Sequence, residues 1–187
     1  MKTLGLFRHA KSDWDDPRAR DFDRPLNARG SRWAPIMGDH IRRYCLEQGL
    51  VWSRIMSSPA VRAAQTIELA AQGAGLAHGA ALAINWDRRL YLASSATLID
   101  VLRELPESLG SVLMVGHNPG LEDLIFDLVP DDGSSPLRDI VEVKFPTASF
   151  ALLTLDIARW AEVDDGCARL VHLKRPRDLG PDGAAAA

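Results

Sequence analysis

The 187-residue chain has little cysteine, no surplus of positive charge and no long apolar run. Cys45 and Cys167 are too few for a disulfide-rich secreted scaffold or a zinc site built from several cysteines, and we expect two buried free thiols in preference to one bridge. Lys and Arg number 22 against 25 Asp and Glu, a formal net charge of -3, so no nucleic-acid partner is expected. No segment approaches the roughly 20 apolar residues of a membrane span, so we expect no membrane partner and a cytoplasmic location.

The composition is that of a globular protein, with 47% hydrophobic and 25% charged residues. The length suits one domain that buries its own core without disulfides or a structural metal. Because small residues dominate Gly180–Ala187, we predict a single domain over residues 1–179 and a flexible tail over residues 180–187. The sequence leaves the oligomeric state open.

Short apolar runs alternate with helical patterns along the first two thirds of the chain. Runs with the length of buried strands lie at residues 2–7, 53–57, 82–84 and 112–115. Helical spacing follows them, from residue 33 to about 48, after Ser58-Pro59, from about 95 to 105, and after Asn118-Pro119. Ser58 and Asn118 are residue types that cap helices, and the prolines after them suit the first helical position.

The first helix has two possible starting points, and the last third of the chain has a different pattern. The first helix can begin at Asn27 or Ser31, and Pro35 is expected near its first turn. The last third is predicted to contain strands without helices between them, at residues 141–145, 149–155 and 169–173. The early alternation favours an α/β fold with right-handed crossovers, and the late strands favour an antiparallel part of the sheet.

Three polar clusters occupy equivalent places in this pattern. Arg8 and His9 follow the first strand, Arg62 lies in the first helical turn after the second, and His117 follows the run at residues 112–115. In an open α/β sheet, ligands bind outside the carboxyl ends of parallel strands. If these strands are parallel, the four side chains meet at one edge of the sheet.

These residue types suit a phosphoryl group. Arginine presents a planar fork of donors that matches phosphate oxygens. A neutral histidine held in one tautomer can attack phosphorus, and a second histidine can donate to a phosphoryl oxygen. The sequence contains no Walker-type glycine loop and no metal-ligand spacing. We expect the acidic run Asp13, Asp15 and Asp16 to be a solvated loop, and His40 to be a core or rim residue.

Three ordered motifs, LFRHAKSDW, SSPAVRAAQT and LMVGHNP, resemble the histidine phosphatase superfamily, the phosphoglycerate mutase-like proteins. The RHAKSDW stretch, DRPLNARG, and the late PTAS and PRDL segments are similar to its SixA-type phosphohistidine phosphatase branch. The resemblance implies a three-layer α/β/α sandwich with a mostly parallel sheet. It also implies that His9 is the nucleophile, that Arg8 and Arg62 clamp the phosphoryl oxygens, and that His117 completes the pocket. Neither a metal nor an organic cofactor is implied.

The chain departs from the family pattern at three places. Ala10 replaces the glycine of the usual RHG, and its methyl group is expected to narrow the turn beside His9. Asp15 stands where mutase relatives carry asparagine, so we expect it to turn away from a phosphate or to face a cationic substrate group. The glutamate acid of many relatives is absent from Asn85–Tyr91, where Asp87 is the nearest carboxylate. The general acid is therefore Asp87 or absent.

The leading functional hypothesis is a metal-independent phosphatase that acts on a phosphorylated protein or small molecule through phospho-His9. The first alternative is a mutase on sugar or glycerate phosphates, for which 187 residues leave little room for substrate-wrapping insertions. The second is a catalytically silent module that binds a phosphorylated ligand, which would need the arginines but not His9.

Overall fold

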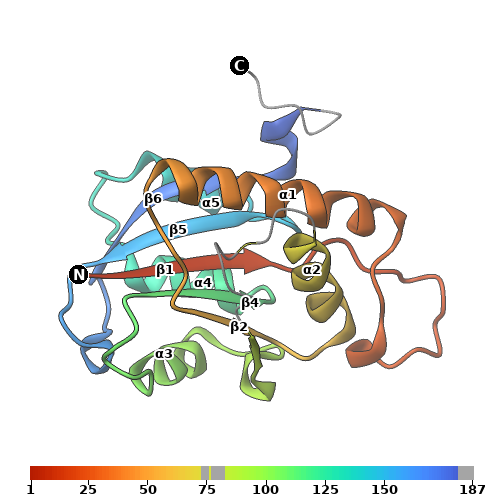
Figure 1. Ribbon diagram of the computed structural model, residues 1–187, viewed down its shortest axis with the longest axis horizontal. Coiled ribbons are helices and arrows are strands. Elements are labelled where there is room, and N and C mark those ends of the chain that lie inside the picture. The colour runs from red at the N-terminus through yellow and green to blue at the C-terminus, as the bar shows by residue number, and fades with distance from the viewer. Residues whose placement is uncertain (73–75, 77–82, 181–187) are drawn as a thin grey trace.

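The computed structural model describes residues 1–72, 76 and 83–180, and in this part of the chain strands and helices alternate as predicted. The strands of one sheet are β1 (Lys2–Arg8), β2 (Arg54–Ser57), β3 (Ile84–Trp86), β4 (Ser111–Gly116), β5 (Phe150–Leu155) and β6 (Ala168–Lys174). Their order across the sheet is β3-β2-β4-β1-β5-β6 (Figure 1). The pairs β1–β4, β2–β4 and β2–β3 are parallel, whereas β5 is antiparallel to β1 and to β6. The predicted mostly parallel sheet with a late antiparallel part is confirmed.

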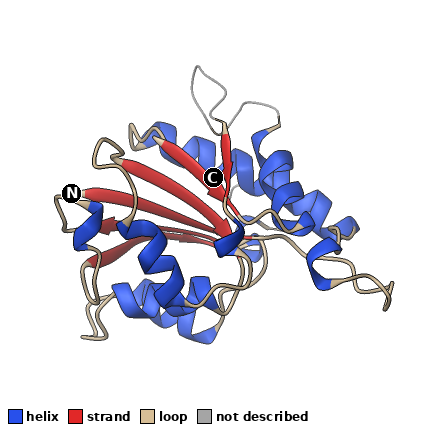
Figure 2. Cartoon of the chain, turned by 90° about the horizontal axis from the view of Figure 1, so that it is seen from below, coloured by secondary structure: helices blue, strands red, loops and turns tan. Residues whose placement is uncertain are grey.

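Helices cover both faces of the sheet, so the fold has the predicted three layers (Figure 2). Helices α1 (Ala28–Glu47) and α2 (Val61–Ala71) pack together over one face, and α3 (Ser95–Arg103), α4 (Gly120–Leu128) and α5 (Pro136–Val143) cover the other. Alternation along β1 supplies both cores, because Phe7 points into the first and Leu4 and Leu6 into the second. The central strands β1 and β4 are therefore buried on both sides, as expected for parallel strands with crossover helices. None of the described helices is both long and apolar enough to cross a membrane.

Helix α1 begins at Ala28 because the side chain of Asn27 accepts a hydrogen bond from Gly30 N at 2.9 Å. Asn27, and not Ser31, is thus the cap. The expectation for Pro35 is wrong, since it lies inside the helix, where its exposed position leaves the unpaired carbonyl of Ser31 accessible to water. A Cβ at Gly30 would lie 2.1 Å from the carbonyl oxygen of Lys11. Glycine therefore allows α1 to approach the segment that leaves β1.

The predicted strand at residues 141–145 is wrong, because α5 extends through Val143. Ser135 caps this helix by accepting from Arg138 N, and Pro136 occupies its first turn. The other two late strands are confirmed as β5 and β6. The strand predicted at residues 82–84 is displaced along the chain, because β3 begins only at Ile84. Residue 82 lies outside the described residues, as do residues 181–187 of the predicted tail. Both cysteines are free, as predicted, with Cys45 buried and Cys167 half-buried.

Candidate active site

The carboxyl ends of three adjacent strands bring the predicted side chains together. His9 follows β1, His117 follows β4, and Arg62 lies in the first turn of α2 after β2. Their exposed fractions are only 8% for His9, 2% for Arg62 and 3% for His117. The two histidine rings are 5.0 Å apart between centroids, and Arg62 Nε lies 3.4 Å from His9 Nε2. These three residues therefore form one buried cluster.

The backbone fixes the tautomer of His9. Its Nδ1 lies 2.7 Å from the carbonyl oxygen of Ala10, which can only accept, so Nδ1 carries the proton and Nε2 presents a lone pair. Burial lowers the pKa of His9 to about 3; the charges of Arg62 and Arg8 act in the same direction, and the hydrogen bond to Ala10 opposes them. The imidazole is thus neutral near pH 7. In the structure this unprotonated Nε2 accepts a hydrogen bond from Arg62 Nε at 3.4 Å. A neutral ring with an unprotonated Nε2 is the form that can act as a nucleophile.

Ala10 follows His9 in the turn after β1. It is fully buried and packs within the core beneath α1 and α2. Its N–H donates to Thr66 Oγ1 at 2.9 Å, and that hydroxyl donates to the carbonyl of Arg62 at 2.6 Å. These hydrogen bonds tie the turn after β1 to the first turns of α2.

Arg8 comes from the last position of β1. Its Nη1 donates to the carbonyl of Phe145, while its Nε is buried and has no hydrogen-bond partner among the described residues. Burial lowers the pKa of Arg8, and the carboxylate of Glu122 opposes this effect. A buried guanidinium N–H without a partner costs free energy. An oxyanion bound at this edge of the sheet would satisfy it.

Ser58 contacts His117. The prediction that Ser58 caps α2 is wrong. Helix α2 begins at Val61 without a side-chain cap, and Ser58 Oγ lies 2.9 Å from His117 Nε2. Since Ser58 Oγ also accepts from Ala60 N, its own hydrogen can donate to His117 Nε2. Nδ1 of His117 then carries the proton, and it is buried without a hydrogen-bond partner in the described part of the chain. Burial lowers the pKa of His117 to about 3, and repulsion from protonated His9 and from Arg62 adds to the effect.

Asn118 also has a role other than the predicted cap. Helix α4 begins at Gly120 with Pro119 in the cap position and without a side-chain cap. The amide nitrogen of Asn118 donates instead to Glu122 at 3.0 Å and to the carbonyl of Phe145 at 3.2 Å. Asn118 therefore ties the segment after β4 to the segment before β5, which also receives Arg8.

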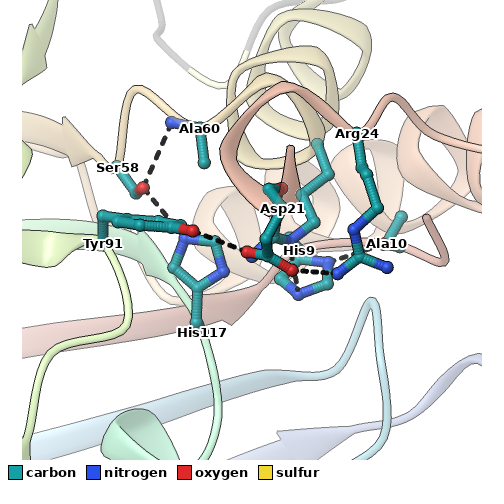
Figure 3. A network of polar contacts seen from close by, with 9 residues as sticks. His9, Ala10, Asp21, Arg24, Ser58, Ala60, Tyr91 and His117 are labelled. Carbon is teal, nitrogen blue, oxygen red and sulfur yellow. Dashed lines mark hydrogen bonds and ion pairs between the residues drawn. The ribbon is translucent and has the colours of Figure 1, made fainter. Parts of the chain in front are cut away.

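Three further residues of the site were missed by the sequence prediction: Asp21, Arg24 and Tyr91 (Figure 3). The carboxylate of Asp21 accepts from Arg62 Nη2 at 2.9 Å, from the Tyr91 hydroxyl at 2.6 Å and from Arg24 Nη2. Burial of Asp21 opposes ionisation, but the hydrogen bonds from Tyr91 and Arg24 and the charge of Arg62 prevail and lower its pKa to about 2. An anionic group thus already occupies donors of the arginine cluster beside His9.

Asp21 and Arg24 belong to a loop whose two ends are joined. Ser12 forms an antiparallel bridge with Leu26, and Asp13 N donates to the carbonyl of Pro25 at 2.8 Å. Asp15 is exposed in this loop, and its backbone N–H donates to Asp13. The structure places Asp15 at the solvent-exposed part of the loop, in agreement with the expected solvated acidic run.

Asp87 does not have the properties of a general acid. Its carboxylate pairs with Arg89 at 2.8 Å, and this hydrogen bonding lowers the pKa of Asp87. Near neutral pH it is ionised and has no proton to donate. His40 is a rim residue, as expected, since it is half-buried and its Nε2 lies 2.9 Å from Nε2 of His172 on the edge strand β6.

Comparisons with known proteins find related sequences and structures. A model of the histidine phosphatase superfamily (branch 1) matches residues 4–88. An uncharacterized protein of Mycobacterium tuberculosis is 34% identical over 172 residues, which cover 91% of this chain and 99% of that relative. A candidate phosphohistidine phosphatase SixA from Agrobacterium tumefaciens is 28% identical, with a TM-score of 0.71 and coverage of 94% of this chain and 98% of that chain. The histidine phosphatase SixA complexed with tungstate shares the fold at 22% identity, a TM-score of 0.71 and coverage of 95% and 99%.

The chain belongs to the histidine phosphatase superfamily. The predicted similarity to the SixA-type branch is confirmed by the match to the Agrobacterium tumefaciens structure. The predicted fold class is confirmed with it.

Replacing Asp21 with asparagine should strengthen the binding of tungstate or inorganic phosphate about tenfold, because the oxyanion no longer displaces a carboxylate from Arg62 and Arg24. Isothermal titration of wild type and Asp21→Asn measures the change. Asp23→Asn is the matched control, since Asp23 is exposed in the same short helical turn. Weaker oxyanion binding by Asp21→Asn would show that the carboxylate positions the arginines and does not compete for them.

Proposed function

We propose that the protein is a phosphatase that works through a phosphohistidine intermediate on His9. The observation that carries the proposal is the neutral His9 ring, with its Nε2 lone pair 3.4 Å from the guanidinium of Arg62. A nucleophile beside a fixed cation is what phosphoryl transfer needs, since this chemistry depends on positioning and on neutralising charge. The proposed location is the cytoplasm.

In the first step, Nε2 of His9 attacks phosphorus, and the bond from phosphorus to the leaving group breaks. Arg8 and Arg62 donate to the phosphoryl oxygens, and Nδ1 of His117 supplies a third donor as charge develops on them. In the second step, water attacks the phosphohistidine, the N–P bond breaks, and His9 returns to its neutral form. Inorganic phosphate leaves with the oxygen of that water. The proposed chemistry uses no metal ion.

We further propose that the substrate is a phosphohistidine or another activated phosphoryl compound. An alkoxide leaving group needs a positioned acid, which contributes about 10²–10⁴-fold. Asp87 and Asp21 are both ionised near neutral pH, because hydrogen bonds hold their pKa values low. The imidazole of a phosphohistidine can take a proton from solvent and leave as a neutral ring. The leaving group of an aryl phosphate is a phenolate, which is stable as an anion. Neither leaving group requires an acid from the protein.

The ratio of kcat/KM for a phosphohistidine peptide to that for a phosphoserine peptide of the same sequence should be at least about 10²-fold, the contribution of the missing acid. The assay contains excess EDTA, under which turnover should persist. A ratio near one would contradict the proposed substrate class.

The activity of Asp87→Asn is measured with the same two peptides. Loss of the phosphoserine activity alone would identify Asp87 as the acid.

A further inference from the structure

A second cluster of positive charge adjoins the candidate active site. A cavity of about 180 Å³ is lined by four basic residues from separate segments: Lys11 after β1, Arg29 in α1, Lys144 after α5 and Arg177 near the end of the described chain. None of the described residues that line it is acidic. The cavity is therefore strongly cationic in a chain whose formal net charge is -3.

These charges have no close carboxylate partner, in contrast to those of some other basic residues. Arg138 and Arg175 each have a carboxylate at hydrogen-bonding distance. In the described part of the chain, Lys11, Arg29 and Lys144 have no ion pair, and Arg177 only reaches Asp178 at 4.0 Å. Like charges that converge on one cavity repel each other, and an anion bound there removes the repulsion.

The position of Arg29 gives a second indication. It lies in the first turn of α1, where the partial positive charge of the helix end disfavours a cation. The first turn of α1 contains no acidic residue, and its cap is the neutral side chain of Asn27. Arg29 thus adds charge where helix stability disfavours it, and a bound anion would benefit from both the side chain and the helix end.

The cavity shares a wall with the site around His9. Ala148, which lines the cavity, donates its N–H to the carbonyl oxygen of His9 at 3.1 Å. Lys144 precedes Phe145, whose carbonyl accepts from Arg8. The backbone at residues 145–148 therefore borders both the cavity and the site around His9. The remaining wall includes Trp33 and Pro146, which offer apolar surface to the group that carries the anion.

We infer that this cavity binds a second anionic group of the substrate. The substrate is then a compact phosphoryl compound that carries another phosphate or carboxylate in addition to the phosphoryl group transferred to His9. This inference rests on the proposed phosphatase function and specifies the class of its substrate.

The test uses phenyl phosphates that carry a carboxylate or a phosphonate on a methylene, ethylene or propylene tether, each compared with its neutral carboxamide isostere. At the best tether, the anionic compound should have a kcat/KM about tenfold higher than its isostere, which is the effect of one charge-assisted hydrogen bond, and the gain should lie in KM. The carboxylate and phosphonate arms distinguish the two sources of the anion. The double variant Arg29→Gln, Lys144→Gln should lose this preference and leave turnover of the neutral compounds unchanged.

Arg169→Gln is the matched control, because Arg169 is exposed on β6 away from the cavity lining. A thermal melt checks the fold of the double variant, whose Arg29 change removes an unfavourable charge from the start of α1. No preference for anionic tethers at any length, or a preference that the double variant keeps, overturns the inference. Failure to turn over any of these phosphates, neutral ones included, would instead contradict the proposed function.

Discussion

Replacing His9 with alanine should lower kcat/KM for an activated aryl phosphate by at least about 10⁴-fold, because stabilisation by the surrounding arginines cannot substitute for the attacking atom. In the structure, the His9 ring is buried, neutral and held by Ala10, with Nε2 directed at the Arg62 guanidinium. Steady-state kinetics with the purified variant measures the loss. Activity within about tenfold of wild type would exclude His9 as the nucleophile.

His40→Ala is the control for this variant. His40 is a half-buried histidine of α1 that contacts His172, outside the cluster around His9. Removing it deletes an imidazole of the same kind without touching the candidate site, so kcat/KM should stay within about twofold. Circular dichroism of both variants separates lost chemistry from lost folding.

The pH profile of the wild type provides a second readout of His9. Protonation of Nε2 removes the lone pair, so activity is lost as the pH falls through the pKa of His9. Because burial lowers that pKa to about 3, kcat/KM should show no limb from His9 between about pH 7 and about pH 5, once ionisation of the substrate is corrected for. A limb near the ordinary histidine value of 6.5 would show that His9 is not held in this environment.

Arg62→Ala is expected to lower kcat by about 10²–10³-fold, the cost of removing one donor aimed at the charge that grows in the transition state. The Arg62 side chain is almost fully buried, so a cation from solvent cannot replace its charge in the variant. Arg62→Lys should recover only part of the activity, because an ammonium group cannot make the bidentate fork. Arg43→Ala, which removes a half-exposed arginine of α1 paired with Asp39 at 3.1 Å, is the control. An unchanged kcat/KM in Arg62→Ala would reduce Arg62 to a structural partner of Asp21.

The sequence predicted the meeting of His9, Arg62 and His117 because their positions depend on local patterns. Each follows a short apolar run, and parallel strands bring their carboxyl ends to the same edge of the sheet. The register of β1, β2 and β4 was not needed, since only the ends of the strands matter. The tautomer of His9 was not predictable, because it depends on the path of the backbone at Ala10.

Asp21, Arg24 and Tyr91 were missed for a physical reason. The hydrogen bonds of Asp21 join its loop to Arg62 and Tyr91, which lie 41 and 70 positions further along the chain. Local sequence spacing does not predict contacts of this kind. The DRPLNARG segment, which resembles the SixA-type branch, contains Arg24. The contact of Arg24 with Asp21 is local, because Asp21 begins the short helical turn at Asp21–Asp23 and Arg24 directly follows it.

Local capping preferences failed where a tertiary contact competed for the same side chain. Ser58 has the residue type of a cap, but His117 engages its hydroxyl, and Asn118 is engaged by Glu122. The apolar run at residues 141–145 failed differently, because a short run does not distinguish a strand from the last turn of a helix. There the cap at Ser135 and the proline after it decided for a helix.

The most direct test of the proposed mechanism is the covalent intermediate itself. Wild-type protein is mixed with a ³²P-labelled phosphoramidate, quenched within milliseconds in base and digested, and the labelled peptide is identified by mass spectrometry. A phosphohistidine is stable in base and labile in acid, so the account predicts base-stable, acid-labile label on the peptide that contains His9, and none in His9→Ala. Equal labelling of His9→Ala, or label on a peptide without His9, would contradict the assignment of His9 as the nucleophile.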